Sequence, residues 1–411
     1  MHTTLLTGEY PPQPGGVGDY TQCLAQALTA RGHQISILTI QAGRLRGLHV
    51  AAHQATPCLN IGHNLTWSHR CWPAIISALD QLRPAWLHIQ YQTGAYAMLP
   101  GINLLPWRLR ALAGRPRIAV TFHDLREPYL FPKAGPLRTW VNQYLARASD
   151  ATIVTNASDA ASWRSNGGLA RRCTHFLSAA SPHSRIPASS PSLPHHIPIG
   201  TNIAVAPPPG YQRTAWRAGC GVAPATFVVA YFGLLSPSKG ADQLLAALAQ
   251  LAPPWRLIII GGAATSPQDS AYAKTLRRQI ASLNCNAHVQ ITGHLPDHDV
   301  SGHLLAADCI ALPFRDGASF RRGSLLAALA HGCPVITTQP SHASEQAMLA
   351  PATLLVPRDV PDALRHALER MRSDPALRAQ LAQQGRVLAA QFAWSAIAAQ
   401  HERIYSPCTD G

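Results

Sequence analysis

The chain has 411 residues, 47% of them apolar and 13% charged, so it can bury more than one sizeable core and is not globally disordered. Its net charge is +14, and residues 1–200 carry most of it, with 17 Lys and Arg against 7 Asp and Glu. This imbalance favours an anionic surface or substrate for the first half. The arginines are scattered without interleaved aromatic residues, which argues against nucleic acid as a partner.

The segments that would indicate export or metal binding are missing from the sequence. The nine cysteines show no CxxC and no metal-ligand spacing, which indicates thiols in a reducing compartment and predicts no metal site. Met1 is followed at once by a strand-like run, and the apolar stretches are too short to cross a bilayer. We therefore expect a cytoplasmic protein, with at most peripheral contact at the inner face of an anionic membrane.

The first half starts with a strand, a glycine loop, a helix and the strand 34–40, the beginning of a doubly wound α/β domain. The loop GEYPPQPGGVGDY contains Gly15, Gly16 and Gly18, and Asp19 is expected to cap the helix that follows. Glycines let a ligand approach the backbone, although a purely geometric role is an alternative. The spacing does not fit the dinucleotide fingerprint G-x-G-x-x-G.

Further strands are predicted at 86–91, 118–122 and 151–155, with helices near 69–82, 95–112, 137–148 and 157–166. His123 and Asp124 follow one of these strands, at the end where open parallel sheets bind ligands. The neighbouring Arg126 strengthens this interpretation. A histidine that only makes a local hydrogen bond is the alternative.

The segment 178–200 is rich in Pro, Ser and His and predicts a hinge before a second α/β domain. Strands are expected there at 227–232, 256–260, 288–292 and 310–312, with helices at 243–251, 268–283 and 297–306. Lys239, one of three lysines in the chain, lies between a strand end and a helix start, where it can reach a phosphate. The alternative is a solvated lysine.

The stretch 309–338 predicts a strand, a polar loop, a short helix capped by Ser324 and ended by Gly332, and another strand. Ser319, Arg321, Arg322 and Gly323 gather where backbone N–H groups point out of the helix start. This pattern is typical of an anion site, although a solvated loop remains the alternative.

In order and spacing, the chain resembles the retaining glycosyltransferases of family 4, which have the GT-B fold. The matching segments are PPQPGGVGDY, VTFHD, IPIGTNI, YFGLLSPSKG, LIIIGG, HVQITGHLP, AADCIALPF, LLAALAHGCPVITT and the terminal W…I…IY helix. The resemblance implies two doubly wound Rossmann-like domains facing a central cleft: an acceptor-side domain (1–198), a donor-binding domain (199–385), and a C-terminal helix (386–411) that returns to the first domain.

The resemblance also implies a reaction and roles for individual residues. A sugar passes from a nucleotide-diphosphate sugar to a carbohydrate or lipid-linked acceptor, with neither metal nor cofactor. The resemblance assigns His123 and Lys239 to the reacting sugar and the diphosphate, and it places Gly15, Gly16, Gly18 and the amides of Gly323 and Ser324 near the donor phosphates. From this chain's own residues we add Arg322 as a third expected catalytic residue, and Ser319, Arg321 and Arg322 as expected phosphate-binding residues. Asp19, Asp124 and Arg126 are expected on the acceptor side for the same reason.

The sequence departs from the family pattern at three positions. The arginine usual after the FG turn is replaced by Leu234, and two glutamates eight residues apart are replaced by Ser319 and Ala327. We hypothesise that Arg322 supplies the charge missing at position 234, because an arginine binds phosphate oxygens bidentately. A binding or scaffold protein without turnover, and another GT-B enzyme such as a nucleotide-sugar epimerase, remain alternatives.

Overall fold

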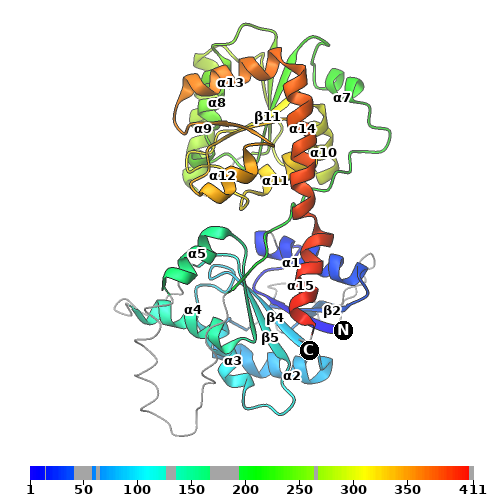
Figure 1. The fold of residues 1–411 in the computed structure, drawn as a ribbon, viewed down its shortest axis with the longest axis vertical. Coiled ribbons are helices and arrows are strands. Elements are labelled where there is room, and N and C mark those ends of the chain that lie inside the picture. Colours follow the sequence, from blue (N-terminus) through cyan, green and yellow to red (C-terminus); the bar gives the residue numbers. More distant parts are fainter. Residues whose placement is uncertain are drawn as a thin grey trace. The chain divides into compact units, whose positions relative to one another are not determined.

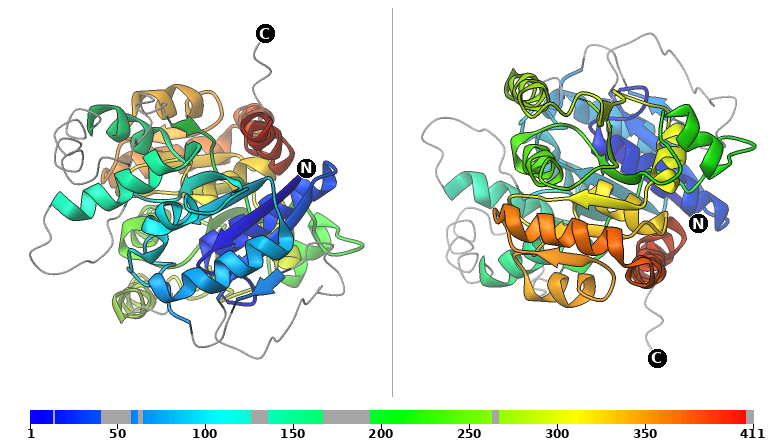
Figure 2. Two further views of the ribbon diagram at one scale, coloured as in Figure 1. Left: turned by 90° about the horizontal axis from the view of Figure 1, so that it is seen from below. Right: turned by 90° about the horizontal axis from the view of Figure 1, so that it is seen from above.

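The computed structural model describes residues 1–13, 15–40, 58–61, 65–125, 136–166, 194–262 and 267–406. The chain divides into two compact units, Met1–Ile199 with Trp394–Gly411, and Gly200–Ala393. Each unit is a parallel sheet with helices on both faces, which is the predicted fold class (Figures 1 and 2).

The first unit is built on a sheet whose described strands follow the order β3-β2-β1-β4-β5-β6-β7. They are β1 (His2–Thr7), β2 (Gln34–Thr39), β3 (Cys58–Asn60), β4 (Trp86–Tyr91), β5 (Arg117–Phe122), β6 (Ala151–Val154) and β7 (His195–His196). The central strands are buried along nearly their whole length, as expected for a parallel sheet covered on both faces. The strand order reverses between β1 and β4, so the loops after these two strands flank the switch point of the sheet.

Helices cover both faces of this sheet. One core contains side chains of α2 (Trp72–Leu82), α3 (Gly101–Leu109), α4 (Pro136–Ala148) and α5 (Ala157–Asn166), and the other contains those of α1 (Gly16–Ala30) and α15 (Trp394–Tyr405). A 3₁₀ turn, η1 (His69–Cys71), precedes α2. The helix predicted at 95–112 is shorter, because turns with positive φ at Ala97 and Met98 precede it.

Helix α15 belongs to the first unit although it follows the second unit in the sequence. Ile397 and Tyr405 are buried in the first unit, and the indole N–H of Trp86 donates to the carbonyl oxygen of Tyr405 at 3.0 Å. The boundary expected at 385/386 falls inside α14 (Pro375–Ala389), which packs on α11 (Gly323–Ala330) of the second unit. The change of unit comes after Ala393.

The second unit has a sheet with the described order β10-β9-β8-β11-β12-β13. The strands are β8 (Phe227–Phe232), β9 (Trp255–Ile260), β10 (Val289–Ile291), β11 (Cys309–Leu312), β12 (Val335–Thr338) and β13 (Leu354–Val356). The helices are α7 (Arg213–Gly219), α8 (Ala241–Leu248), α9 (Pro267–Ser282), α10 (Asp297–Ala306), α11 (Gly323–Ala330), α12 (Ala343–Leu349), α13 (Pro361–Ser373) and α14; η2 (Pro237–Lys239) and η3 (Ala390–Phe392) are 3₁₀ turns. Here the order reverses between β8 and β11.

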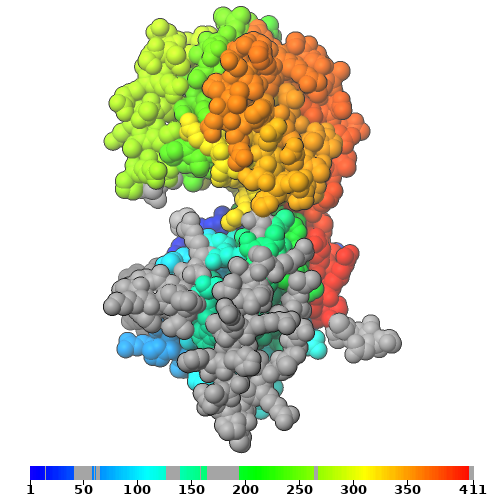
Figure 3. All heavy atoms as spheres, turned by 60° about the vertical axis from the view of Figure 1, so that its left-hand side comes forward, coloured from blue at the N-terminus to red at the C-terminus, as the bar shows by residue number. Residues whose placement is uncertain are grey.

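The main core of this unit lies between the sheet and helices α8, α9 and α13. In the space-filling view α9 and α13, coloured yellow-green and orange, form part of its outer surface (Figure 3). Gly332 ends α11 with a positive φ of 64°, as the sequence predicted.

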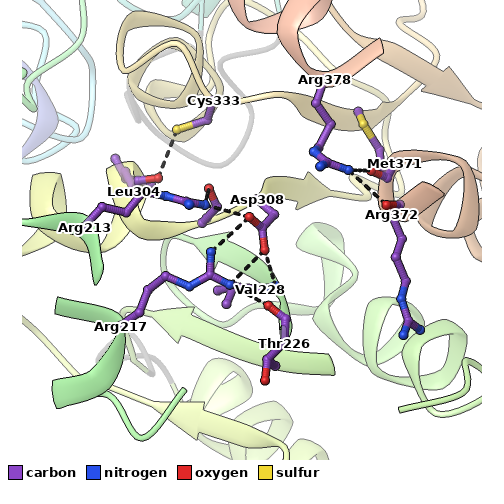
Figure 4. A network of polar contacts seen from close by, with 11 residues as sticks. Arg213, Arg217, Thr226, Val228, Leu304, Asp308, Cys333, Met371, Arg372 and Arg378 are labelled. Carbon is purple, nitrogen blue, oxygen red and sulfur yellow. Dashed lines mark hydrogen bonds and ion pairs between the residues drawn. The ribbon is translucent and has the colours of Figure 1, made fainter. Parts of the chain in front are cut away.

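The amino ends of the central strands carry an ion-pair network centred on Asp308 (Figure 4). Its Oδ1 accepts from Arg213 at 2.6 Å and from Arg217 at 3.0 Å, and its Oδ2 accepts from Arg217 and from the amide of Val228. Arg217 also donates to the carbonyl oxygen of Thr226 at 2.5 Å. The network ties α7 to β8 and β11.

Candidate functional site

Two loops of the second unit leave the carboxyl ends of β8 and β11, the strands on either side of its switch point. Open parallel sheets bind ligands at this place. The loops are held together: the amide of Arg315 donates to the carbonyl oxygen of Ser238 at 2.9 Å, and a Cβ on Gly240 would lie 2.2 Å from the carbonyl oxygen of Pro313. Glycine is required at position 240, where φ is 69°.

Lys239 lies in the first of these loops, beside the start of α11. A Cβ on Gly233 would lie 3.3 Å from Lys239 Nζ and 3.9 Å from Ser324 Oγ, so these groups surround one small space. Burial lowers the pKa of Lys239, and the nearby Arg322 guanidinium lowers it further. No hydrogen bond or ion pair joins Lys239 Nζ to another residue of the described chain. Asp269 raises the pKa of Lys239 to a smaller extent, so the two neighbouring cations favour an anion beside them.

Arg322 is the residue before α11, with an extended backbone, and its guanidinium carbon lies 4.8 Å from the centre of the Phe314 ring. It donates to the exposed Asp316 carboxylate. Leu234, where the family has an arginine, is 51% exposed and brings no charge. The guanidinium of Arg322 lowers the pKa of Lys239, so the two cations are near neighbours. This proximity is what the hypothesis that Arg322 replaces the arginine absent at position 234 requires.

The remaining residues expected at this loop take different positions. Ser324 lies inside the first turn of α11 and does not cap it; the N-cap is Arg322, so that prediction was wrong. A Cβ on Gly323 would meet nothing within 4 Å, which leaves its backbone open to a ligand. Arg321 is exposed, whereas Ser319 Oγ donates to Glu345 Oε1 at 3.1 Å.

The glycine loop of the first unit has an internal anion at the helix start. Glu9 Oε1 accepts from the amides of Val17 at 2.9 Å and Gly18 at 3.4 Å, and a Cβ on Gly15 would lie 2.1 Å from the Glu9 carboxyl carbon. Gly15 is the N-cap of α1 and Gly16 is its first residue. The prediction that Asp19 caps α1 was wrong, because Asp19 lies within the first turn. Glu9 was not predicted from the sequence, where its only signal is an acidic residue shortly before a helix start.

His123 directly follows β5, and its ring packs edge-on against Tyr20 with 4.6 Å between ring centres. Its Nε2 is 3.0 Å from Gln90 Oε1, so Nε2 carries the proton in this pair and Nδ1 is left as an acceptor. Burial lowers the pKa of His123 to about 3, and His401 acts in the same direction. The imidazole is therefore neutral near pH 7 and suits hydrogen bonding better than proton transfer.

The other acceptor-side residues are less informative. Asp124 follows His123 and is partly buried. Arg126 lies outside the described residues. Sequence reasoning also missed Gln90 and Glu345, which meet His123 and Ser319 only through the tertiary fold.

Two family models match the chain: Glycosyltransferase Family 4 over residues 14–177, and Glycosyl transferases group 1 over residues 212–388. The chain belongs to the glycosyltransferases. The match confirms the resemblance inferred from the motifs and the predicted enzyme class.

Curated glycosyltransferases are similar to the chain over different shares of their length. A GDP-mannose-dependent alpha-(1-6)-phosphatidylinositol monomannoside mannosyltransferase of Mycolicibacterium smegmatis is 27% identical over 93% of this chain and 92% of its own. A D-inositol 3-phosphate glycosyltransferase of Jonesia denitrificans is 30% identical over 53% of this chain and 52% of its own. The chain therefore spans only about half the length of the Jonesia denitrificans relative.

Solved glycosyltransferase structures have the same fold. Sucrose-phosphate synthase of Thermosynechococcus elongatus matches with a TM-score of 0.69 and 22% identity over 98% of both chains. HepE of Anabaena, in complex with UDP and glucose, matches with a TM-score of 0.68 and 20% identity over 98% of this chain and 99% of its own. These likenesses support the GT-B fold predicted from the sequence.

Proposed function

We propose that the protein transfers a sugar from a nucleotide-diphosphate sugar to an acceptor with retention of anomeric configuration. The observation that carries the proposal is the pair of cations, Lys239 and Arg322, beside the start of α11 at the switch point of the second unit. The first unit is the acceptor-side domain in this proposal, with His123 and the glycine loop near the reacting sugar.

The chemistry follows from the charge that develops during transfer. As the bond to the anomeric carbon breaks, negative charge gathers on the leaving diphosphate. The ammonium of Lys239, the guanidinium of Arg322 and the amides of Gly323 and Ser324 are placed to stabilise that charge. Neutral His123 offers a hydrogen bond without repelling a cation-like sugar. That the reaction needs neither metal nor cofactor stays a prediction.

The relatives indicate where the search for substrates should begin. The one matched over almost its full length is named as GDP-mannose-dependent and as acting on a phosphatidylinositol mannoside. HepE was solved with UDP and glucose. GDP-mannose and UDP-glucose are therefore the first donors to test, and a lipid-linked or glycolipid acceptor is the first acceptor class.

A lipid-linked acceptor would bring the first unit to the cytoplasmic face of an anionic membrane. Trp107 on α3 is 61% exposed and lies 6.3 Å from Trp72, ring centre to ring centre. Arg108 and Arg110 follow it, and residues 81–123 contain no Asp or Glu. Exposed tryptophan beside arginine suits the interface of an anionic bilayer. No helix in the described part of the chain could span a membrane.

The membrane part of the proposal is tested by co-sedimentation with vesicles containing phosphatidylglycerol. Binding at low salt that falls at high salt, and that is weakened by Trp107→Ser, is expected. Equal recovery with and without vesicles would overturn it.

The activity is tested by thermal-shift measurements with UDP, GDP, ADP and their sugars, followed by product analysis with glycolipid acceptors. A ligand that binds only the folded protein raises the melting temperature. Stabilisation by one nucleotide sugar and formation of an α-linked product from an α-linked donor are expected. Donor isomerisation without transfer would indicate an epimerase, and binding without any conversion would indicate a scaffold.

A further inference from the structure

Glu345 is a buried acid beside the loop that carries Arg322. It lies in the first turn of α12, is 6% exposed, and accepts from Ser319 Oγ at 3.1 Å and from the amide of Phe320 at 3.2 Å. Both bonds go to Oε1, and no described residue donates to Oε2 or forms an ion pair with the carboxylate. A glutamine could accept the same two bonds, so these two contacts alone do not require an acid at position 345.

The other carboxylates around the same two loops are paired. Asp316 accepts from Arg322, and Arg315 binds Asp242 at 2.7 Å and Asp359 at 3.6 Å. Their charges hold arginines in place. Glu345 differs from these three acids, because its donors in the described part of the chain are neutral and its Oε2 accepts from none of them.

The turn that binds Glu345 also presents the phosphate-binding arginine. The amide of Arg322 donates to the carbonyl oxygen of Ser319 at 3.0 Å, and the amide of Arg321 donates to Ser319 Oγ at 3.3 Å. One short turn thus connects a carboxylate to cations. A nucleotide sugar has the matching chemistry, because its diphosphate is followed directly by a ring of hydroxyl groups, and a carboxylate is a strong acceptor for hydroxyls.

We infer that Glu345 accepts hydrogen bonds from hydroxyl groups of the donor sugar and so makes the site prefer a nucleotide sugar to the bare nucleoside diphosphate. The inference rests on the proposed function. Ser319 stands where the family pattern has a glutamate, and Glu345 brings a carboxylate to the same place from α12.

The test compares the affinities for GDP and GDP-mannose, and for UDP and UDP-glucose, by calorimetry. Glu345→Gln keeps an acceptor for Ser319 and Phe320 but replaces the second carboxylate oxygen with a donor. We expect the gain in affinity that the sugar brings to fall about tenfold, since a hydrogen bond to a charged group is lost, while nucleoside diphosphate affinity stays within about twofold. Glu369→Gln, an exposed acid on α13, is the matched control.

The outcomes separate this inference from the proposed function. If the wild type binds none of UDP, GDP, ADP and their sugars, the proposed function fails; otherwise the comparison is made with the nucleoside diphosphate and nucleotide sugar that bind. If the wild type binds them and Glu345→Gln keeps the full gain from the sugar, only the role of Glu345 is overturned.

A second test exchanges the residues at positions 319 and 345, so that the inference does not depend on the Glu345→Gln variant folding correctly. Ser319→Glu alone brings two carboxylates together and should abolish the sugar's gain, whereas Ser319→Glu with Glu345→Ser should restore it. A merely structural clamp predicts that Glu345→Gln lowers the affinity for the nucleoside diphosphate together with the sugar's gain, whereas the inference predicts that only the gain falls. A swap variant that binds the nucleoside diphosphate but gains nothing from the sugar would overturn the inference.

Discussion

The two ends of the central strands in the second unit carry charge in opposite ways. At the amino ends, Asp308 is surrounded by Arg213, Arg217 and the amide of Val228. At the carboxyl ends, Lys239 has no ion pair within the described chain, and Arg322 has only the exposed Asp316. The first arrangement is complete without a ligand, and the second leaves cationic charge for one.

Local charge density alone would not separate these two ends, because both contain arginines beside aspartates. The difference lies in burial and in the number of partners. The Arg217 and Asp308 side chains are 10% and 17% exposed, whereas Asp316 is 58% exposed. A buried, fully bonded network indicates a structural role, and a half-buried cation without a partner indicates a binding role.

The largest effect is expected from Lys239→Ala, which removes a cation from the carboxyl ends of the strands. Removing the ammonium should lower kcat/KM for transfer about 10²- to 10³-fold, because charge on the leaving diphosphate loses its stabilisation. Steady-state assays with the donor identified by thermal shift measure the effect. Lys274→Ala, at an exposed position on α9, is the control and should leave the rate unchanged. Equal rates for the two variants would remove Lys239 from the site.

Asp308→Asn should instead act on stability. Removing the charge leaves Arg217 buried and unpaired, which we expect to cost about 3 kcal/mol in the free energy of unfolding of the second unit. Denaturant titration measures the loss. Donor affinity of the folded variant should match that of the wild type, and a selective loss of donor binding would contradict the structural role.

The pH dependence of this loss follows from the pKa of Asp308. Burial alone would raise that pKa, but hydrogen bonds from Arg217, Val228 and Arg213 outweigh it, so the pKa is lowered. The stabilisation is therefore fully present above the ordinary aspartate value of about 3.9 and disappears as the pH falls through the lowered one. The stability gap between wild type and Asp308→Asn should stay constant from about pH 8 to 5 and close below about pH 4.

Arg322→Ala should weaken donor binding by about tenfold, since hydrogen bonds from a charged group to phosphate are lost. Arg321→Ala, in the neighbouring exposed position, should change it by no more than about twofold. Calorimetry with the nucleoside diphosphate distinguishes the two. If Arg321 proved the more important residue, the assignment within this loop would have to be reversed.

The smallest effect is expected from Asp316→Asn, which frees Arg322 from its surface partner. Donor affinity should rise by about two- to threefold at low salt, because an exposed ion pair contributes at most about 1 kcal/mol. The difference should vanish at high salt. A decrease in affinity would mean that Asp316 holds Arg322 in the binding position.

The sequence predicted the central strands of both sheets and the two ligand loops, because both depend on local signals, but it missed the short edge strands β3, β7 and β13. Apolar runs mark the strands, and Gly240 and Gly332 mark turns that need positive φ. Partners that come from other elements could not be predicted. Glu345 reaches Ser319 from 26 residues further along the chain, and Glu9 takes the capping position that had been given to Asp19. No residue spacing encodes such contacts.

The position of α15 also constrains how the chain folds during synthesis. The first unit buries Ile397 and Tyr405, which the ribosome makes only after the whole second unit. An N-terminal unit can usually begin to fold first. Here it would wait with the α1 side of its sheet only partly covered until α15 emerges. A chain stopped before Trp394 should therefore contain a folded second unit and an incomplete, aggregation-prone first one.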